Sequence, residues 1–173
     1  EIDRAMTLAA AAFDTFRKAT VEQRARFLEV CSDEVEALGD QLIEMTMAET
    51  GHPQGRCIGE RGRATGQARM FAQFIREGSW VDARIDLPQP DRQPLPKPDV
   101  RSLMMPVGPV VVFGASNFPF AYSTAGGDTA CALAAGCPVI VKAHSAHTRT
   151  APSSSRTSWI RSSLAALAPP SPS

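Results

Sequence analysis

Two short β-branched segments constrain this chain most, because they lie on either side of a stretch of small residues. Val107–Phe113 (VGPVVVF) and Pro138–Lys142 (PVIVK) have the composition of buried parallel strands. Between them, Tyr122–Ala135 has the small residues of a tightly packed helix, and Gly136 follows as its stop. Strand, loop, helix and strand within about 30 residues predict one βαβ unit and therefore an α/β fold.

Ligands of open parallel sheets bind beyond the carboxyl ends of the strands. In this unit those ends are Gly114–Asn117 and Lys142–Ser145, and no G-x-G-x-x-G fingerprint is present. Asn117 could donate a hydrogen bond to an oxyanion, although a loop asparagine more often holds its own turn. Lys142 could meet a ribose or a phosphate as a point charge, or it could simply reach water.

Four amphipathic helices are predicted before this unit, because apolar residues recur at three- and four-residue spacing. Thr20 followed by Gln23 has the pattern of a capping box and should start the second helix. Glycines follow the expected ends of the later helices. The expected bounds are Ile2 to about Lys18, Thr20 to Gly39, Leu42 to Glu49 with Gly51 and Pro53 after it, and about Arg56 to Glu77 with Gly78 after it.

Residues 81–99 differ from both neighbours, because they hold five of the fourteen prolines. Proline removes a backbone donor, so this stretch can be neither a helix nor a central strand. We expect an extended connector or an edge element. Val100 to Met105 could form a further strand.

Positive charge is concentrated in one predicted helix and is balanced over the whole chain. Eighteen Lys and Arg face eighteen Asp and Glu, and the pI is about 7.1, so nucleic acid is not an expected partner. The favoured interpretation of the helix is a solvated charged face, and an anionic ligand site stays open as the alternative. Its arginines are Arg56, Arg61, Arg63, Arg69 and Arg76.

The sequence shows no sign of a membrane span or a secretory signal. No apolar run approaches the roughly 18 residues of a membrane span. The first residues, Glu1-Ile2-Asp3-Arg4, lack a basic start and an apolar stretch. We therefore expect a cytoplasmic protein with no membrane partner, and 173 residues suffice for one ordinary domain.

Cysteines and histidines give little sign of a metal site. The four cysteines form no C-x-x-C pair and are expected to be small buried hydrophobic residues. His144 and His147 form an H-x-x-H pair that could be half of a metal site. No cysteine or carboxylate lies close by in sequence to complete the ligand set, so no metal is expected.

The run from Pro106 to Thr148 resembles the first part of the cofactor domain of the NAD(P)-dependent aldehyde dehydrogenase superfamily. AETGHP at 48–53, GE at 59–60 and REGSW at 76–80 resemble it too. GASNFP and AGGDTACALAAGCPVIVKAH are most similar to the α-ketoglutarate semialdehyde (2,5-dioxovalerate) dehydrogenases and the related bacterial fatty-aldehyde dehydrogenases. The resemblance implies the N-terminal part of that fold: helices plus an incomplete Rossmann-like parallel sheet.

The resemblance also implies a chemistry. In that family a cysteine thiolate attacks the aldehyde, hydride passes to the nicotinamide, and a glutamate activates the water that releases the acid. The oxyanion donor would be Asn117, and Lys142 would bind the adenosine ribose. Gly114, Ala115 and Ser116 would line the cofactor groove through their backbone.

The cofactor expected from this resemblance is NADP, with NAD as the alternative. Relatives that prefer NAD commonly carry a glutamate three residues after the lysine, and here that position is Ser145. A carboxylate would repel a 2′-phosphate, whereas a hydroxyl can donate to it. NADP should therefore be accepted and preferred.

By this resemblance the chain divides into residues 1–80 as the helical part of the cofactor domain, 81–99 as an arm that pairs with another subunit, and 100–150 as the first βαβ unit. The nucleophile and the general base would lie beyond residue 173, so the chain alone is expected to be inactive and its parent a homo-oligomer. The parent's substrate would be 2,5-dioxovalerate or a long-chain fatty aldehyde. A non-enzymatic nucleotide-binding or assembly module stays open as the alternative.

Residues 151–173 break from everything before them. They contain eight Ser, four Pro and four Ala, with no Gly and no acidic residue. The family resemblance predicts an amphipathic helix here, and suitable codons read one base upstream would give one. A frameshift near Thr150 is therefore favoured over a genuine Ser/Pro-rich linker.

Overall fold

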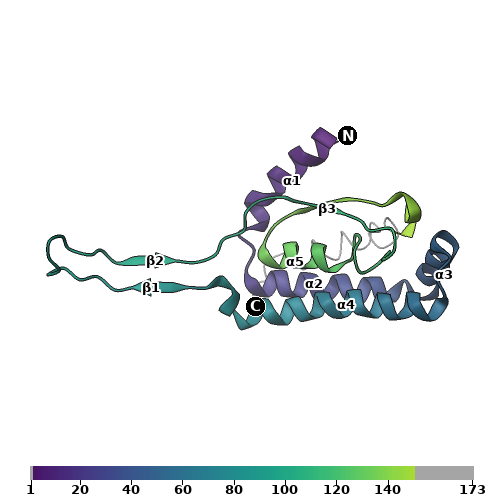
Figure 1. The fold of residues 1–173 in the computed structure, drawn as a ribbon, viewed down its shortest axis with the longest axis horizontal. Helices are drawn as coiled ribbons and strands as arrows, with labels where there is room; N and C mark the ends of the chain where they lie inside the picture. Colours follow the sequence, from purple (N-terminus) through teal and green to yellow (C-terminus); the bar gives the residue numbers. More distant parts are fainter. Residues whose placement is uncertain (1, 151–173) are drawn as a thin grey trace, which may run out of the picture.

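In the computed structural model, which describes residues 2–150, a layer of helices packs against a small parallel sheet, and a long hairpin extends from one end (Figure 1). Helices α2 and α4 run antiparallel, and α5 packs against both of them. The helices are α1 (Ile2–Phe16), α2 (Val21–Ala37), α3 (Gly39–Thr50), α4 (Gln54–Glu77) and α5 (Gly127–Ala135), with 3₁₀ turns η1 (Ser79–Val81) and η2 (Ser145–His147). The strands are β1 (Arg84–Asp86), β2 (Val100–Ser102), β3 (Val110–Phe113) and β4 (Val139–Lys142). The expectation of an aberrant Ser/Pro-rich segment at 151–173 falls outside the described residues.

The core lies where α2, α4 and α5 meet. Small residues on α4 and α5 let the three helices approach closely, and larger side chains from α2 and α4 fill the space between them. One cluster of buried side chains here comprises Ala25, Phe27, Leu28, Cys31, Ala68, Ala72, Ile75, Ala130 and Ala134. A second cluster, toward α3, comprises Val35, Leu42, Ile43, Cys57, Ala64 and Phe120.

The start of α2 confirms the predicted capping box. The Gln23 amide donates to the Thr20 hydroxyl at 3.2 Å, and the Thr20 amide donates to the Gln23 side-chain oxygen at 2.8 Å. Both of these backbone donors are thereby satisfied. A local sequence signal was sufficient here because both partners lie within one turn.

Helix ends were predicted well where a glycine follows. Gly51, Gly78 and Gly136 are the C-caps of α3, α4 and α5 and adopt the left-handed conformation that glycine takes without a steric penalty. Gly39 also has a positive φ of 53°, but it opens α3 directly after the α2 cap residue, so α3 starts three residues earlier than predicted.

The two predicted parallel strands pair in parallel, with Phe113 opposite Lys142. The two strands are less buried than expected, although Val112 is only 5% exposed. Val111 is 43% exposed and Phe113 is 72% exposed, because within the described residues β3 has only β4 as a neighbour and α5 packs on part of the pair.

The predicted helix Tyr122–Ala135 is shorter than expected and begins at Gly127. The preceding residues form turns because their backbone groups have other partners. In a helix the Tyr122 carbonyl would accept from the Gly126 amide, but here it accepts from the Ala115 amide at 2.8 Å. The Gly126 amide donates instead to the Ser123 carbonyl at 3.0 Å. Backbone groups paired in this way cannot form the first turn of a helix.

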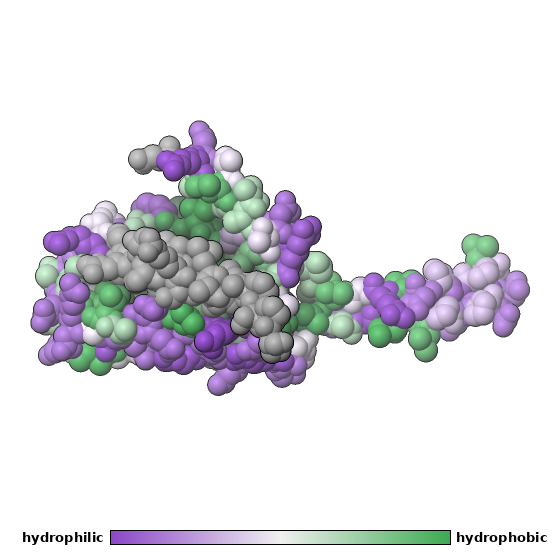
Figure 2. Space-filling model, turned by 180° about the vertical axis from the view of Figure 1, so that it is seen from behind, coloured by the Kyte–Doolittle hydropathy of each residue, from purple (hydrophilic) through white to green (hydrophobic). Residues whose placement is uncertain are grey.

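The proline-rich stretch lies in a two-stranded antiparallel hairpin that projects from the helices (Figure 1). β1 pairs with β2, so the predicted strand after residue 100 belongs to this hairpin and not to the parallel sheet. Apolar side chains lie exposed among polar ones along it (Figure 2). Its pairing with another subunit stays a prediction. The exposed apolar residues of the hairpin include Ile85, Leu87, Leu95 and Val100.

Of the four cysteines, three are buried as predicted: Cys31, Cys57 and Cys137. Cys131 is exposed, so the prediction was wrong for it. It lies on the side of α5 that borders an open cleft of about 350 Å³ beside β3, where the described residues leave the helix uncovered. No helix among the described residues is long and apolar enough to cross a membrane.

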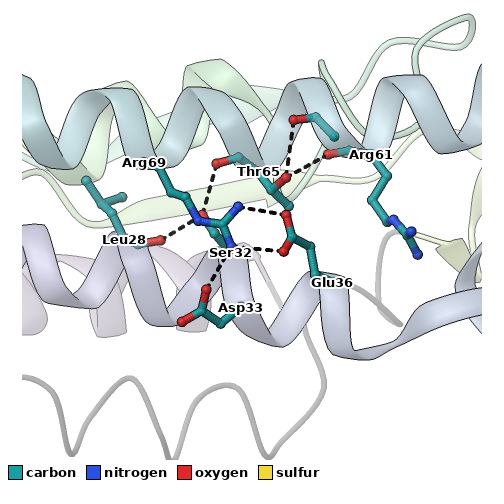
Figure 3. A network of polar contacts seen from close by, with 8 residues as sticks. Leu28, Ser32, Asp33, Glu36, Arg61, Thr65 and Arg69 are labelled. Carbon is teal, nitrogen blue, oxygen red and sulfur yellow. Dashed lines mark hydrogen bonds and ion pairs between the residues drawn. The ribbon is translucent and has the colours of Figure 1, made fainter.

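Ion pairs join α4 to α2 along their exposed edge (Figure 3). Arg69 donates to Asp33 at 2.7 Å and to both oxygens of Glu36 at 2.7 and 2.9 Å. Beneath them the Ser32 hydroxyl donates to the Thr65 carbonyl at 3.1 Å. Hydrogen bonds from Arg69, and then from Thr65, lower the pKa of Glu36 from 4.5 to about 2.

This lowered pKa gives a prediction for the pH dependence of stability. The fold favours the ionised form of Glu36, so its contribution is complete above about pH 4.5 and is lost as the pH falls toward about 2. Because the pair is partly exposed, we expect a modest effect. Glu36→Gln should lower the melting temperature at pH 7 and make little difference at about pH 2 or below. Glu44→Gln, at an exposed glutamate with no ion pair among the described residues, is the control. If Glu36→Gln lowered the melting temperature equally at both pH values, the prediction would be contradicted.

Candidate functional site

The carboxyl ends of β3 and β4 meet at one edge of the parallel pair. Phe113 lies opposite Lys142, and the Gly114 amide donates to the Lys142 carbonyl at 3.0 Å. The two segments predicted to bind a ligand, 114–117 and 142–145, therefore leave the sheet side by side. This adjacency follows from the parallel pairing and the register.

The chain is closely packed behind this edge at Gly114. A Cβ there would lie 3.2 Å from the His144 amide nitrogen, 3.4 Å from the Lys142 carbonyl and 3.6 Å from the Ser123 hydroxyl. Glycine thus lets the two strand ends approach each other. A larger residue would push the 114–117 segment away from the end of β4.

Ala115 is held from both sides. Its amide donates to the Tyr122 carbonyl at 2.8 Å, and its carbonyl lies 2.7 Å from Nε2 of His147, which is fully buried. Because a carbonyl only accepts, this contact places the imidazole proton on Nε2. His147 therefore ties the segment after β4 to the segment after β3, a role that its H-x-x-H spacing did not suggest.

Four predicted site residues present exposed side chains at this edge: Ser116, Asn117, Lys142 and Ser145. Within residues 2–150, none of these side chains makes a hydrogen bond or an ion pair. An ammonium, two hydroxyls and an amide are thus available to a ligand. No acidic residue occurs in 114–117 or 142–148 to oppose an anionic ligand.

The loop after Asn117 rests on α4 through a buried carboxylate. Oε1 of Glu60 accepts from the amides of Phe120 at 2.9 Å and Ala121 at 3.0 Å, and Glu60 is only 6% exposed. The sequence alone predicted no role for Glu60, although GE at 59–60 is among the motifs of the family resemblance. Its position seven residues after Pro53 gives no sign of a partner 60 residues away.

Two arginines of α4 also contact this loop. Arg56 donates to the Asn117 carbonyl at 2.6 Å, and its guanidinium lies 5.3 Å from the centroid of the Phe118 ring. Arg63 donates to the Tyr122 hydroxyl at 3.1 Å and lies over the rings of both aromatic residues. Both residues are exposed, as expected of a solvated face, but each also makes a contact with this loop that the expectation did not include.

His144 and His147 do not form a metal site with their neighbours. Nδ1 of His144 accepts from the Ala146 amide at 3.0 Å, and the two rings stack with centroids 5.8 Å apart. In the part of the chain that the structure describes, no three His, Cys, Asp or Glu side chains gather around a point that could hold a metal.

Comparison with known proteins gives the family of this fold and site. The sequence profile described as the aldehyde dehydrogenase family matches residues 1–155. The chain belongs to the aldehyde dehydrogenase family. This is a family of oxidoreductases, generally dependent on NAD(P).

Two curated members of the aldehyde dehydrogenase family are similar over most of the chain. Alpha-ketoglutaric semialdehyde dehydrogenase 2 of Azospirillum brasilense is 58% identical over 150 residues, and alpha-ketoglutaric semialdehyde dehydrogenase of Acinetobacter baylyi is 52% identical over 151 residues. Each match covers 87% of this chain and 29% of the relative. The chain therefore spans less than a third of the length of these relatives.

The fold agrees with solved members of the aldehyde dehydrogenase family. The crystal structure of HpcC from Thermus thermophilus aligns with a TM-score of 0.76 at 23% identity. The alignment covers 98% of this chain and 30% of that one. The expected partial fold, with helices and an incomplete parallel sheet, is confirmed.

Proposed function

We propose that this chain forms part of the cofactor-binding region of an enzyme that oxidises α-ketoglutarate semialdehyde (2,5-dioxovalerate) to 2-oxoglutarate, with NADP as the hydride acceptor. The observation that carries the proposal is the identity of 58% and 52% to two relatives named for that substrate. The nucleophilic cysteine and the general base would come from sequence that this chain does not match in those relatives.

The residues at the strand ends fit a phosphorylated dinucleotide. Lys142 supplies a positive charge, and the hydroxyls of Ser116 and Ser145 can donate to phosphate or ribose oxygens. All three side chains are exposed and have no other partner within residues 2–150. The absence of a carboxylate from residues 142–148 favours a 2′-phosphate on the ribose.

Each residue would have a separate task in the reaction. NADP, when bound, would accept the hydride that leaves the substrate carbon. The side-chain amide of Asn117 would donate to the oxyanion that forms when a thiolate adds to the aldehyde. Lys142 and Ser145 would bind the adenosine ribose and its 2′-phosphate, and the backbone of Gly114, Ala115 and Ser116 would line the groove.

A chimaeric enzyme tests this proposal directly. Residues 1–150 of this chain would replace the matched segment of the Azospirillum brasilense relative, to which they are 58% identical. We expect a folded chimaera that oxidises 2,5-dioxovalerate and reduces NADP. Asn117→Ala should lower kcat about 100-fold or more, as loss of an oxyanion donor does. A folded chimaera that oxidises other aldehydes and not 2,5-dioxovalerate would refute the substrate assignment.

Ser145→Glu in the chimaera is expected to move the cofactor preference from NADP toward NAD. A carboxylate at this position would repel the 2′-phosphate and could accept from the ribose hydroxyls of NAD. We expect the ratio of kcat/KM for NADP to that for NAD to fall by about tenfold or more, which corresponds to about 1.4 kcal/mol. Thr148→Glu, an exposed position in the same segment, is the matched control. An unchanged ratio in Ser145→Glu would remove Ser145 from the cofactor site.

A further inference from the structure

Four of the five arginines of α4 fall into two groups with different partners, and the fifth, Arg61, donates to the Gly39 carbonyl at 2.9 Å. Arg69 and Arg76 are each held by two carboxylates of α2, as Figure 3 shows for Arg69 with Asp33 and Glu36. These pairs neutralise the positive charge locally and join the two helices. Nothing further is needed to explain Arg69 and Arg76.

Arg56 and Arg63 have no such neutralising partner. Among residues 2–150, no carboxylate lies within ion-pair distance of either guanidinium. Glu60 lies between them in sequence, but Oε1 of its carboxylate accepts from backbone amides of the loop. Both arginines are exposed, so two unpaired positive charges lie in the N-terminal half of α4, where the helix contacts the loop of residues 117–122.

Aromatic rings fix where these charges lie. The guanidinium carbons of Arg56 and Arg63 are 5.3 and 6.0 Å from the centroid of the Phe118 ring, and Arg63 is 5.4 Å from that of Tyr122. The two rings in turn pack edge to face, with centroids 5.4 Å apart. Arginine stacked in this way loses little further side-chain entropy when it binds an anion.

Each guanidinium retains donors for a ligand. Of five N–H donors, one from Arg56 goes to the Asn117 carbonyl and one from Arg63 to the Tyr122 hydroxyl. The remaining donors match the planar geometry of a carboxylate, which a guanidinium binds with two parallel hydrogen bonds. Because Arg56 donates to the Asn117 carbonyl at 2.6 Å, its charge lies beside the backbone of the proposed oxyanion donor.

We infer that Arg56 and Arg63 form the subsite for the carboxylate at the far end of the substrate, and thereby select a short aldehyde that carries a carboxylate over an uncharged one. This inference rests on the proposed function, because it takes Asn117 as the point where the aldehyde oxygen binds. In 2,5-dioxovalerate three carbons separate the aldehyde carbon from the carboxylate carbon, a short span that lets one molecule contact the Asn117 loop and the helix beside it at the same time. A fatty aldehyde has no group to pair with either arginine.

The test compares two aldehydes in the chimaera. Arg56→Met and Arg63→Met keep much of the apolar packing and remove the charge. Each should lower kcat/KM for 2,5-dioxovalerate by about tenfold or more, the effect of a lost charged hydrogen bond, while kcat/KM for pentanal changes by less than about twofold. The inhibition constant of 2-oxoglutarate should rise in parallel. Arg69→Met is the matched control on the same helix and should leave the ratio of the two aldehydes unchanged.

Each outcome decides the inference. An equal loss for both aldehydes would show that the arginines only support the loop, and would overturn it. If the parent chimaera oxidises succinate semialdehyde but not 2,5-dioxovalerate, the proposed substrate fails, and the same ratio measured with succinate semialdehyde and butanal still tests the subsite. If the methionine variants do not fold, Arg56→Lys and Arg63→Lys replace them in the test, because they retain the positive charge. Each should lower kcat/KM for 2,5-dioxovalerate by a smaller factor and again leave kcat/KM for pentanal nearly unchanged.

A measurement on the 173-residue chain needs no catalysis. Titration with 2-oxoglutarate, followed through the Nε–H signals of the arginine side chains by NMR, should shift the signals of Arg56 and Arg63 and leave that of Arg69 in place. Hexanoate has a carboxylate on an apolar tail, and 1-hexanol has none; the first should shift the same signals and the second should not. No shift of either signal with 2-oxoglutarate would overturn the subsite.

Discussion

Adding one methyl group at Gly126 should destabilise the chain by about 3 kcal/mol, at the upper end of the usual cost of overpacking. A Cβ at this position would lie 2.4 Å from the carbonyl oxygen of Ala121, 2.7 Å from its carbonyl carbon and 2.9 Å from the carbonyl oxygen of Phe120. All three atoms belong to the backbone, so no side chain can rotate to relieve the clash. The φ of Gly126 is −82°, which any residue can adopt, so the whole cost is steric.

Gly126→Ala should also change the structure of the proposed site. Phe120 and Ala121 belong to the turn that follows Asn117, and the Gly127 amide donates to the Ala121 carbonyl at 3.0 Å. Moving these carbonyls would therefore disturb both the Asn117 loop and the start of α5. In the chimaera we expect kcat to fall together with stability.

Urea denaturation of the 173-residue chain measures the effect, and Gly62→Ala is the control. Gly62 lies in α4 with nothing within 4 Å of its Cβ position, so alanine there should stabilise the helix by about 0.5–1 kcal/mol. If Gly→Ala lowers the free energy of unfolding at position 126 and raises it at position 62, then the loss at Gly126 comes from steric packing and not from helix propensity. A wild-type denaturation midpoint for Gly126→Ala would refute the close approach.

The features that the sequence predicted correctly depend on neighbours in the chain. The capping box of Thr20 and Gln23 lies within one helical turn, and the glycine caps act on the residues just before them. The parallel pairing of β3 and β4 followed from two β-branched segments separated by one helix. These local signals also bring Asn117 and Lys142 to the same edge, although their roles stay predictions.

The features that the sequence did not predict depend on contacts between distant segments. Arg56 and Arg69 lie on the same helix and look alike in sequence, yet one meets an aromatic loop and the other meets carboxylates of α2. Contacts outside the expected helix also explain why its first part, from Tyr122, is missing: the Tyr122 carbonyl accepts from the Ala115 amide of the segment after β3 instead of from the Gly126 amide. Helical spacing reports which side chains share a face, but it does not report what that face meets.

Removal of the Glu60 carboxylate should be the most damaging change on α4. Phe120 and Ala121 are essentially inaccessible to water, so Glu60→Ala would leave two buried amides without an acceptor. Each unsatisfied buried group costs about 1–3 kcal/mol, and we expect a total loss of about 3 kcal/mol. Glu60→Gln keeps one oxygen acceptor but loses the charge, so its cost should be about half as large.

Hydrogen exchange at two amides separates this explanation from a general loss of stability. In Glu60→Ala the amides of Phe120 and Ala121 should exchange faster by a larger factor than the amides in the middle of α2, whereas Glu44→Ala, at an exposed site, should change neither group. In the chimaera, Glu60→Gln should lower kcat and leave the KM for NADP nearly unchanged, because Glu60 positions the loop of Asn117 and does not contact the end of β4. Wild-type protection of both amides in Glu60→Ala would contradict this role, since no other acceptor for them exists among the hydrogen bonds of residues 2–150.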